Sequence, residues 1–306
     1  MKTIIDKLKG MLVGLAAGDA VGTTVEFEAR GTFDPVTDMT GGGPFNLVKG
    51  QWTDDTSMAL CLAESLIEKQ GFDALDQMQR YTAWHSTGHL SSTGRCFDIG
   101  ITISVALSRF CVSGDPYSGS KDPHSAGNGS IMRLAPIVMA YYKNERLLEF
   151  AANSSRTTHA CEEAIESSKL FASQLRMAVI TDCDNDMAKD NILLKHGYQS
   201  KSPKVSDVAN GNYLTKTYEQ LTGSGYVIES LESALWCFYN SSSFKEAILK
   251  ATNLGNDADT TAAICGQIAG AYYGYAAIPE SWRKALAKRE LIEDYADKLS
   301  EFSTSN

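Results

Sequence analysis

The sequence has no two cysteines in C-x-x-C spacing, although it contains seven cysteines. They are scattered along the chain, at positions 61, 96, 111, 161, 183, 237 and 265. A disulfide framework or a zinc ribbon would need paired, closely spaced cysteines. We therefore expect reduced thiols that pack as small apolar groups, as in a cytoplasmic protein.

Long apolar runs and an excess of basic charge are also missing. No stretch of about 18 uncharged apolar residues occurs, so we expect no membrane-spanning helix. Asp6, Lys7 and Lys9 interrupt the apolar core that a signal peptide would need. Lysine and arginine number 28 against 37 acidic residues, giving a net charge of −9, whereas nucleic acid binds basic faces. We expect a cytoplasmic monomer with no nucleic-acid or membrane partner.

Signatures of nucleophilic hydrolases are absent as well. The sequence has no G-x-S-x-G motif, which serine hydrolases of the α/β type carry at their nucleophile. None of the cysteines lies in an obviously electropositive motif that would stabilise a thiolate. A serine or cysteine triad therefore finds no support.

Apolar residues recur with helical spacing along almost the whole chain, and strict strand-type alternation is missing. The first helix begins near Ile4, and a second runs from Thr53 to near Gly71, with Lys69 in its last turn. Ser243 and Glu246 fit a capping box. Further helices are predicted at 73–85, 97–110, 131–143, 158–178, 226–240, 244–253, 260–275 and 281–299.

Two segments lack this helical periodicity. Residues 31–52 are rich in glycine and proline and are predicted to form a long loop. Residues 181–224 are polar and irregular, which suggests an inserted loop or flap. No linker, repeat or low-complexity block divides the chain. The sequence therefore predicts one all-α domain spanning residues 1–306.

Acidic side chains gather in two short clusters that lie about two hundred residues apart, Thr53–Thr56 (TDDT) and Asp257–Thr260 (DADT). Each cluster precedes or begins a helix, where carboxylates stabilise the helix N-terminus, so helix capping alone explains either one. Two such clusters together also suggest a metal site if the fold brings them into contact. Oxygen ligands without Cys or His favour hard ions such as Mg²⁺, Mn²⁺ or Ca²⁺. Glu26 is a third carboxylate in a glycine-rich setting.

Two glycine-containing segments are candidates for ligand contact. Gly127-Asn128-Gly129-Ser130 precedes a predicted helix, so its backbone amides can cradle an anion, to which Arg133 would add positive charge. A simple turn explains the same pattern equally well. Asp98, between Gly94 and Gly100, is an acid that a ligand can approach closely.

Two further side chains have an ordinary and a functional interpretation. His159 follows two threonines at a predicted helix start, where a cap or core residue is more common than a catalyst. Tyr226 follows Gly223 and Gly225, and it either packs at a helix start or stacks on a base or ribose. Neither residue decides the function alone.

Together these segments resemble the ADP-ribosylglycohydrolase family over roughly residues 8–290. The matching motifs follow one another in the family's order: Gly14–Phe27 (GLAAGDAVGTTVEF), Thr53–Thr56, Phe97–Gly100 (FDIG), Gly127–Arg133 (GNGSIMR), Thr158-His159, Gly225–Val227 (GYV) and Gly255–Thr261 (GNDADTT). The resemblance implies a single-domain, orthogonal all-α bundle with a binuclear metal site at its centre.

The resemblance also implies a set of roles for individual residues. Two Mg²⁺ or Mn²⁺ ions would be bound by Glu26, Thr53, Asp54, Asp55, Asp257, Asp259 and Thr260. Asp98, with Asp55 and Glu26, would act in catalysis, Asp98 at the arginine leaving group. Substrate would be bound by Gly100, Gly127, Asn128, Gly129, Ser130, His159 and Tyr226. The implied reaction is hydrolysis of the N-glycosidic bond between ADP-ribose and a modified protein arginine, which releases ADP-ribose.

Two alternatives stay open. The chain would instead hydrolyse another ADP-ribosyl linkage, such as a serine, DNA-base or O-acetyl linkage, or it would bind ADP-ribose without catalysis. The FDIG segment favours arginine, and the presence of all seven expected ligands disfavours a non-catalytic relative. The one departure from the family pattern is Asn256, which stands where a second glycine is usual and removes no ligand.

Overall fold

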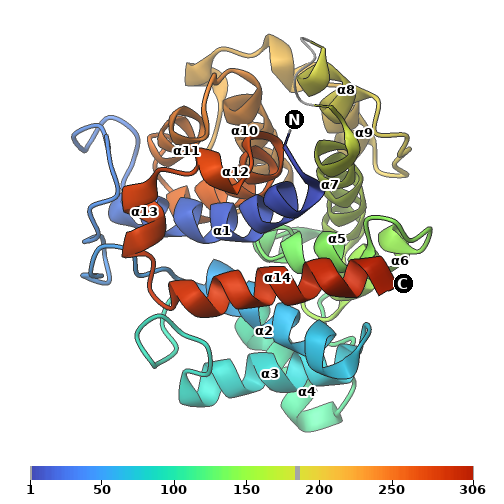
Figure 1. Ribbon diagram of the computed structural model, residues 1–306. Helices are drawn as coiled ribbons and strands as arrows, with labels where there is room; N and C mark the ends of the chain where they lie inside the picture. Colours follow the sequence, from blue (N-terminus) through green and yellow to red (C-terminus); the bar gives the residue numbers. More distant parts are fainter. Residues whose placement is uncertain (1, 183–186, 306) are drawn as a thin grey trace.

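The computed structural model describes residues 2–182 and 187–305, which form helices α1 to α14 joined by loops and short 3₁₀ turns (Figure 1). Within these two ranges there is no sheet, only four isolated β-bridges. The prediction of an all-α fold is confirmed. None of the described helices is long and apolar enough to cross a membrane.

The helices have the following bounds: α1 Ile4–Gly22, α2 Asp54–Lys69, α3 Ala74–Thr87, α4 Ile101–Ser113, α5 Ala135–Tyr141, α6 Leu147–Arg156, α7 Glu162–Ile180, α8 Ala188–Leu194, α9 Pro203–Ala209, α10 Val227–Tyr239, α11 Phe244–Thr252, α12 Ala258–Tyr273, α13 Glu280–Ala285 and α14 Arg289–Ser305.

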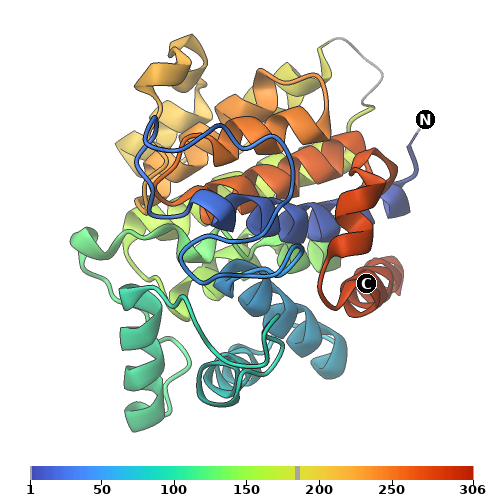
Figure 2. The ribbon, with the colours of Figure 1, turned by 90° about the vertical axis from the view of Figure 1, so that its left-hand side faces the viewer.

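At the centre of the bundle, α1 and α12 run antiparallel and lie side by side in both views (Figures 1 and 2). Their contact is made through backbone, because glycines recur every fourth residue on the facing side of α1. A Cβ on Gly14 would overlap the carbonyl oxygen of Gly266, and one on Gly18 would overlap that of Ala262. Only small residues permit this approach. This close packing places the beginning of α12, which carries the Asp257–Thr260 cluster, beside the end of α1, which belongs to the Gly14–Phe27 motif.

The predicted helix over 281–299 is in fact two helices, α13 and α14. The chain turns between them at Lys288, whose φ is +51°. Hydrogen bonds join the same turn to the loop before α2: Ala287 N donates to Gly50 O at 2.8 Å, and Trp52 Nε1 donates to Ala287 O at 3.1 Å. The break between α13 and α14 therefore allows a contact with the loop before α2, which helical periodicity in the sequence cannot reveal.

Other boundaries also differ from the sequence prediction. Helix α4 begins at Ile101 rather than at 97, because Asp98 has a φ of +51° that no α-helix accommodates. Helix α5 starts at Ala135 and is preceded by a 3₁₀ turn at Asn128–Ser130. Helix α6 was not predicted at all. The six described cysteines are free thiols, as expected, and Cys183 lies outside the described residues.

The segment predicted as an irregular polar loop contains α8 and α9. Ile192, Leu193, Val205 and Val208 are buried, at positions three or one apart on these short helices. The other described residues of that segment are irregular, as predicted, or form short 3₁₀ turns at Asn212–Thr215 and Tyr218–Gln220, and residues 183–186 lie outside the described residues. Short helices of this kind depend on tertiary packing more than on sequence propensity.

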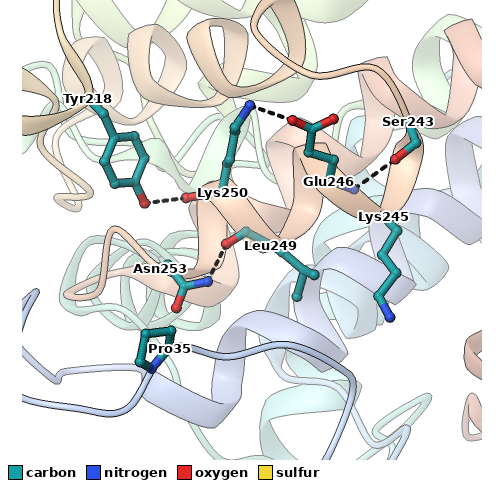
Figure 3. A pocket seen from close by; sticks show the side chains of 8 residues that line it. All are labelled: Pro35, Tyr218, Ser243, Lys245, Glu246, Leu249, Lys250 and Asn253. Carbon is teal, nitrogen blue, oxygen red and sulfur yellow. Dashed lines mark hydrogen bonds and ion pairs between the residues drawn. The ribbon is translucent and has the colours of Figure 1, made fainter.

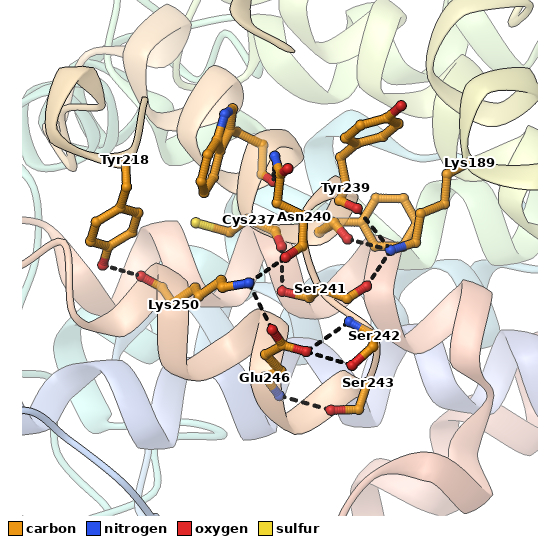
Figure 4. A network of polar contacts seen from close by, with 12 residues as sticks. Lys189, Tyr218, Cys237, Tyr239, Asn240, Ser241, Ser242, Ser243, Glu246 and Lys250 are labelled. Atoms are coloured by element: carbon orange, nitrogen blue, oxygen red, sulfur yellow. Dashed lines mark hydrogen bonds and ion pairs between the residues drawn. The ribbon is translucent and has the colours of Figure 1, made fainter. Parts of the chain in front are cut away.

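The ammonium group of Lys189 anchors this segment to the bundle. Lys189 of α8 points at the C-terminal end of α10, where Nζ donates to the carbonyls of Phe238 at 2.8 Å, Tyr239 at 3.0 Å and Ser241 (Figure 4). The free carbonyls and the negative end of the helix dipole favour a cation at this position. Next to it, Lys250 of α11 binds Glu246 at 2.7 Å.

Candidate active site

The structure brings the two acidic clusters together, although they lie at opposite ends of the sequence. Thr53 Oγ1 is 3.0 Å from Asp259 Oδ2, and Thr260 Oγ1 is 3.5 Å from Asp55 Oδ2. Asp54 and Asp55 lie in the first turn of α2, and Asp259 in the first turn of α12. The carboxylates are thus presented at two helix N-termini, whose positive dipole ends favour negative charge.

A third helix contributes Asp19, which caps α2 from outside. Its Oδ1 accepts from the amide of Thr53 at 2.8 Å, and its Oδ2 accepts from the amide of Thr56 at 3.0 Å. Thr53 occupies the N-cap position of α2, but its own side chain makes no capping bond. Its hydroxyl lies instead 3.1 Å from Asp55 Oδ2. The Thr53 hydroxyl also donates to Asp19 Oδ1 at 2.9 Å, so Asp19 holds this hydroxyl at the acidic site.

Glu26 and Asp98 complete the cluster on its open side. One carboxylate oxygen from each of Glu26, Asp98 and Asp259 lies within 4.8 Å of the others, and the same holds for Asp19, Asp55 and Asp259. Asp259 belongs to both groups and so connects them. The seven carboxylates of this site are Asp19, Glu26, Asp54, Asp55, Asp98, Asp257 and Asp259.

Unusual backbone conformations position these side chains. Phe27, Asp98 and Asn256 have φ values of +64°, +51° and +56°. Phe27 N donates to Asn256 O, and Asn256 N donates to Glu28 O, both at 2.7 Å. These bonds hold the segment after Glu26 against the segment before Asp257. Backbone strain that a structure maintains in this way is characteristic of functional sites.

The site concentrates negative charge away from water. Burial, followed by repulsion from Asp98 and Asp257, raises the pKa of Glu26 to about 9. Burial and then repulsion from Asp19 and Asp257 raise the pKa of Asp98 to about 7. The same two causes raise the pKa values of Asp54, Asp55 and Asp259 well above the usual range. Within residues 2–182 and 187–305, no lysine or arginine forms an ion pair with any of these carboxylates.

The donor set fits a hard divalent cation. Asp55 Oδ1 is buried and has no hydrogen-bond partner among the described residues, although a buried carboxylate oxygen ordinarily has one. All candidate ligand atoms are carboxylate or hydroxyl oxygens, which Mg²⁺, Mn²⁺ and Ca²⁺ prefer. A cation at this place would satisfy Asp55 and offset the crowded charge.

A cavity of about 960 Å³ opens onto this cluster. Eleven of the residues singled out in the sequence line it: Glu26, Asp54, Asp98, Gly100, Gly127, Asn128, Gly129, His159, Asp257, Asp259 and Thr260. Thr53 and Asp55 lie behind this wall and are buried. Ser130 is also buried, and its Oγ accepts from Ser168 Oγ at 3.1 Å rather than facing the cavity.

The glycine-containing loop and His159 form one wall of the cavity. Asn128 Nδ2 donates to Asp257 Oδ2 at 2.7 Å, which joins the loop to the acidic cluster. A Cβ on Gly129 would come within 2.7 Å of His159 Cε1, so glycine is needed for the ring to lie here. Arg133 does not reach the cavity as the sequence suggested. Its side chain is fully buried beneath the loop.

Tyr226 lines a neighbouring cavity of about 520 Å³ that shares Thr102, Gly127 and Gly225 with the first. Its hydroxyl donates to Glu163 Oε2 at 2.5 Å and accepts from Lys204 Nζ at 2.8 Å. Lys204 belongs to α9, so the segment 181–224 reaches the edge of the site.

Another cavity, of about 560 Å³, lies between Pro35, Tyr218 and α11 (Figure 3). Its charged side chains are already engaged, as Lys250 Nζ lies 2.7 Å from Glu246 Oε1. None of the predicted catalytic, substrate-binding or metal-binding residues lines it. The chemistry is therefore expected at the acidic cavity.

Asp19 is the site residue that the sequence interpretation missed. It was present in the run Gly18-Asp19-Ala20-Val21-Gly22, where a buried acid among small residues of a helix is a usable signal. Its role was hidden because its partners, Thr53 and Thr56, are more than thirty residues away.

Comparison with known proteins gives a consistent result. The sequence profile of the ADP-ribosylglycohydrolase family matches residues 1–306. The chain is 42% identical over 298 residues to the ADP-ribosylarginine hydrolase Tri1 of Pseudomonas putida (strain GB-1), covering 96% of this chain and 78% of that protein. It is 29% identical to the ADP-ribosyl-[dinitrogen reductase] glycohydrolase of Rhodospirillum rubrum, covering 93% and 91% of the two chains. A solved structure titled ADP-ribosylglycohydrolase-related protein complex superposes with a TM-score of 0.87 at 41% identity, covering 99% of this chain and all of that one.

Proposed function

This chain belongs to the ADP-ribosylglycohydrolase family, and on that premise we propose that it removes ADP-ribose from modified arginine side chains of proteins. The reaction is hydrolysis of an N-glycosidic bond: water adds a hydroxyl group to the anomeric carbon of the ribose, and the arginine nitrogen leaves with a proton. The products are ADP-ribose and an unmodified arginine, so the activity reverses mono-ADP-ribosylation.

The observation that carries this proposal is the position of Asp98. It lies in the wall of the large cavity, and one of its oxygens is within 4.8 Å of oxygens of Glu26 and Asp259. A leaving guanidine is positively charged when protonated, and a carboxylate can bind it through two parallel hydrogen bonds. The name of the Pseudomonas putida relative, an ADP-ribosylarginine hydrolase, supports the same linkage.

We propose that the acidic cluster binds two Mg²⁺ or Mn²⁺ ions through Glu26, Thr53, Asp54, Asp55, Asp257, Asp259 and Thr260. Such ions supply positive charge that orients ribose hydroxyls and acidifies water at the site. The partnerless Asp55 Oδ1 supports the assignment, because it needs a cationic or hydrogen-bonding partner.

The chain's own carboxylates have distinct tasks in this mechanism. Asp98 binds the guanidine group and assists its departure. Asp55 or Glu26 orients the attacking water and accepts its proton. The positive charge that develops at the anomeric carbon is stabilised by the carboxylates around it. Burial strengthens each of these interactions, because charges interact more strongly at the lower effective dielectric constant of a buried site.

The rest of the ligand extends away from the acidic end. The loop Gly127–Ser130 would face the diphosphate, since its glycines allow the backbone to approach closely. His159 and Tyr226 would lie on the adenosine side, and Gly100 beside the leaving group. Phe27, which is exposed and lines the cavity as Asp98 does, would meet the modified protein.

Purified protein incubated with Mg²⁺ or Mn²⁺ and two substrates tests the proposed linkage. One substrate is a protein ADP-ribosylated on arginine, and the other is a peptide ADP-ribosylated on serine. We expect ADP-ribose release from arginine at least tenfold faster than from serine. Preference for serine would assign the chain to another ADP-ribosyl linkage, and tight ADP-ribose binding without release from either would make it a non-catalytic binder.

A further inference from the structure

The cavity wall near His159 rests on a buried cation. Arg133 is fully buried, and its guanidinium lies 4.8 Å from the ring centre of Tyr81. Its Nη1 donates to the carbonyl of Gly129 at 2.8 Å, and its Nη2 donates to Thr158 Oγ1 at 2.6 Å. A guanidinium has donors only, so the direction of both hydrogen bonds is fixed.

The direction of the next hydrogen bond follows from the first. Because Thr158 Oγ1 accepts from Arg133, its own hydrogen must point elsewhere. Within the part of the chain that the structure describes, the other partner of this hydroxyl is His159 Nδ1, at 2.8 Å. The hydroxyl therefore donates to Nδ1, which accepts. A neutral imidazole that accepts at Nδ1 carries its hydrogen on Nε2.

The His159 ring lies in the wall of the ligand cavity, with Nε2 against the glycine-containing loop. His159 lines that cavity, and a Cβ on Gly127 or Gly129 would lie 3.2 or 3.1 Å from Nε2. Among the described residues Nε2 has no hydrogen-bond partner, whereas Nδ1 has one. Burial, and then the charge of Arg133, lower the pKa of His159 to about 3, so the ring is neutral near neutral pH.

We infer that Arg133 and Thr158 are positioning residues that fix His159 in its Nε2–H tautomer, so that it donates to an acceptor oxygen of the ligand lying against Gly127–Ser130. The inference rests on the proposed function, because it takes ADP-ribose as that ligand. The same arginine anchors the loop through the Gly129 carbonyl, and so one buried side chain sets both the loop position and the donor beside it.

The test combines ¹⁵N NMR of the histidine ring with ADP-ribose affinity, measured on the Mg²⁺-supplemented full chain. In the native protein we expect Nε2 to give a protonated, pyrrole-type signal and Nδ1 an unprotonated, pyridine-type signal. Thr158→Val removes the hydroxyl with little change in volume. It should populate the other tautomer and weaken ADP-ribose binding roughly three- to tenfold, as the loss of a single hydrogen bond does.

Thr158→Ser is the matched control, because it keeps the hydroxyl and should keep both the native tautomer and an affinity within about twofold. Arg133→Lys keeps the charge and provides a second route if Thr158→Val does not fold. Its shorter, differently shaped head group should weaken the bond to Thr158 and shift the tautomer in the same direction.

An Nδ1–H signal in the native protein would overturn the inference. A Thr158→Val protein with an unchanged tautomer, or with unchanged ADP-ribose affinity, would overturn it too. Failure of the proposed function has a different signature: no hydrolysis of arginine-linked or serine-linked substrate, while ADP-ribose binding still depends on Thr158 and the tautomer.

Discussion

The carboxylate of Asp19 accepts hydrogen bonds from both the backbone amide and the hydroxyl of Thr53, at 2.8 and 2.9 Å. It also accepts from the amide and hydroxyl of Thr56, at 3.0 and 2.6 Å. One side chain on α1 thus holds the first turn of α2 in place. Since α1 is packed against α12 through backbone contact, the position of Asp19 also sets the distance between the two acidic clusters.

This arrangement predicts the effect of Asp19→Asn. Asparagine has one acceptor oxygen where Asp19 has two, so it cannot accept the bonds from both Thr53 and Thr56, and the first turn of α2 is held less firmly. We expect a roughly 10- to 100-fold loss of metal affinity, as for other residues that orient metal ligands. Titration calorimetry with Mn²⁺ measures it, with circular dichroism to verify the fold. Native-like Mn²⁺ affinity would contradict the positioning role.

Asp98→Asn tests the leaving-group role. The substituted side chain keeps its size but can no longer take a negative charge or protonate the departing nitrogen. We expect kcat for ADP-ribosyl-arginine to fall by at least about 10², the range typical of a lost acid–base group. Affinity for ADP-ribose, which has no guanidine, should stay within about threefold. Unchanged turnover would remove Asp98 from the mechanism.

Substitutions of Asn256 test whether the backbone conformation at this position matters for stability and for the metal site. Its φ of +56° suits glycine or asparagine and is strained for a β-branched residue. The free energy of unfolding of Asn256→Gly should therefore lie within about 1 kcal/mol of that of the native protein. Asn256→Val should lose about 2 kcal/mol or more and should also weaken Mn²⁺ binding, since Asp257 is the next residue. Chemical denaturation of both variants measures the difference, and equal stability would contradict it.

Asn256 also shows how much of the fold and of the site could be predicted from the sequence. The all-α fold and the ordered motifs were predictable, because helical periodicity and short motifs are local. Asn256 was recognised as a departure from the family pattern, but the positive φ that explains it was not visible. Asp19 and the Arg133 bonds were missed for a related reason: their partners are distant in sequence, and only packing determines them. For this reason the Arg133 side chain was expected to face an anion at the Gly127–Ser130 loop, whereas in the structure it lies buried beneath that loop.

Glu166 of α7 makes the stability of the fold depend on pH, because its carboxylate holds the segment that follows α7. Burial favours its neutral form, but hydrogen bonds from Lys169, Tyr198 and the Lys201 amide outweigh it and lower the pKa of Glu166 to about 2. A carboxylate with a lowered pKa stabilises the fold fully above its unfolded value of 4.5. This stabilisation is lost as the pH falls from there towards 2.

Glu166→Gln should therefore lower the free energy of unfolding by about 2 kcal/mol at pH 7, since hydrogen bonds to a charged acceptor are lost. The difference from the native protein should shrink below pH 4.5. Glu149→Gln is the control, because Glu149 pairs with Arg146 on the exposed surface and should change little. Urea titrations between pH 3 and pH 7 make the comparison. If Glu166→Gln lowered the free energy of unfolding by the same amount at every pH, the lowered pKa of Glu166 would be contradicted.

If the two acidic clusters form one divalent-cation site, hydrolysis of ADP-ribosyl-arginine by this chain requires a divalent cation. The most direct measurement is release of ADP-ribose from arginine-linked substrate by the native protein, first in EDTA and then after Mg²⁺ or Mn²⁺ is returned in excess. We predict that EDTA abolishes release and that the returned ion restores it. Full activity in EDTA would contradict the claim.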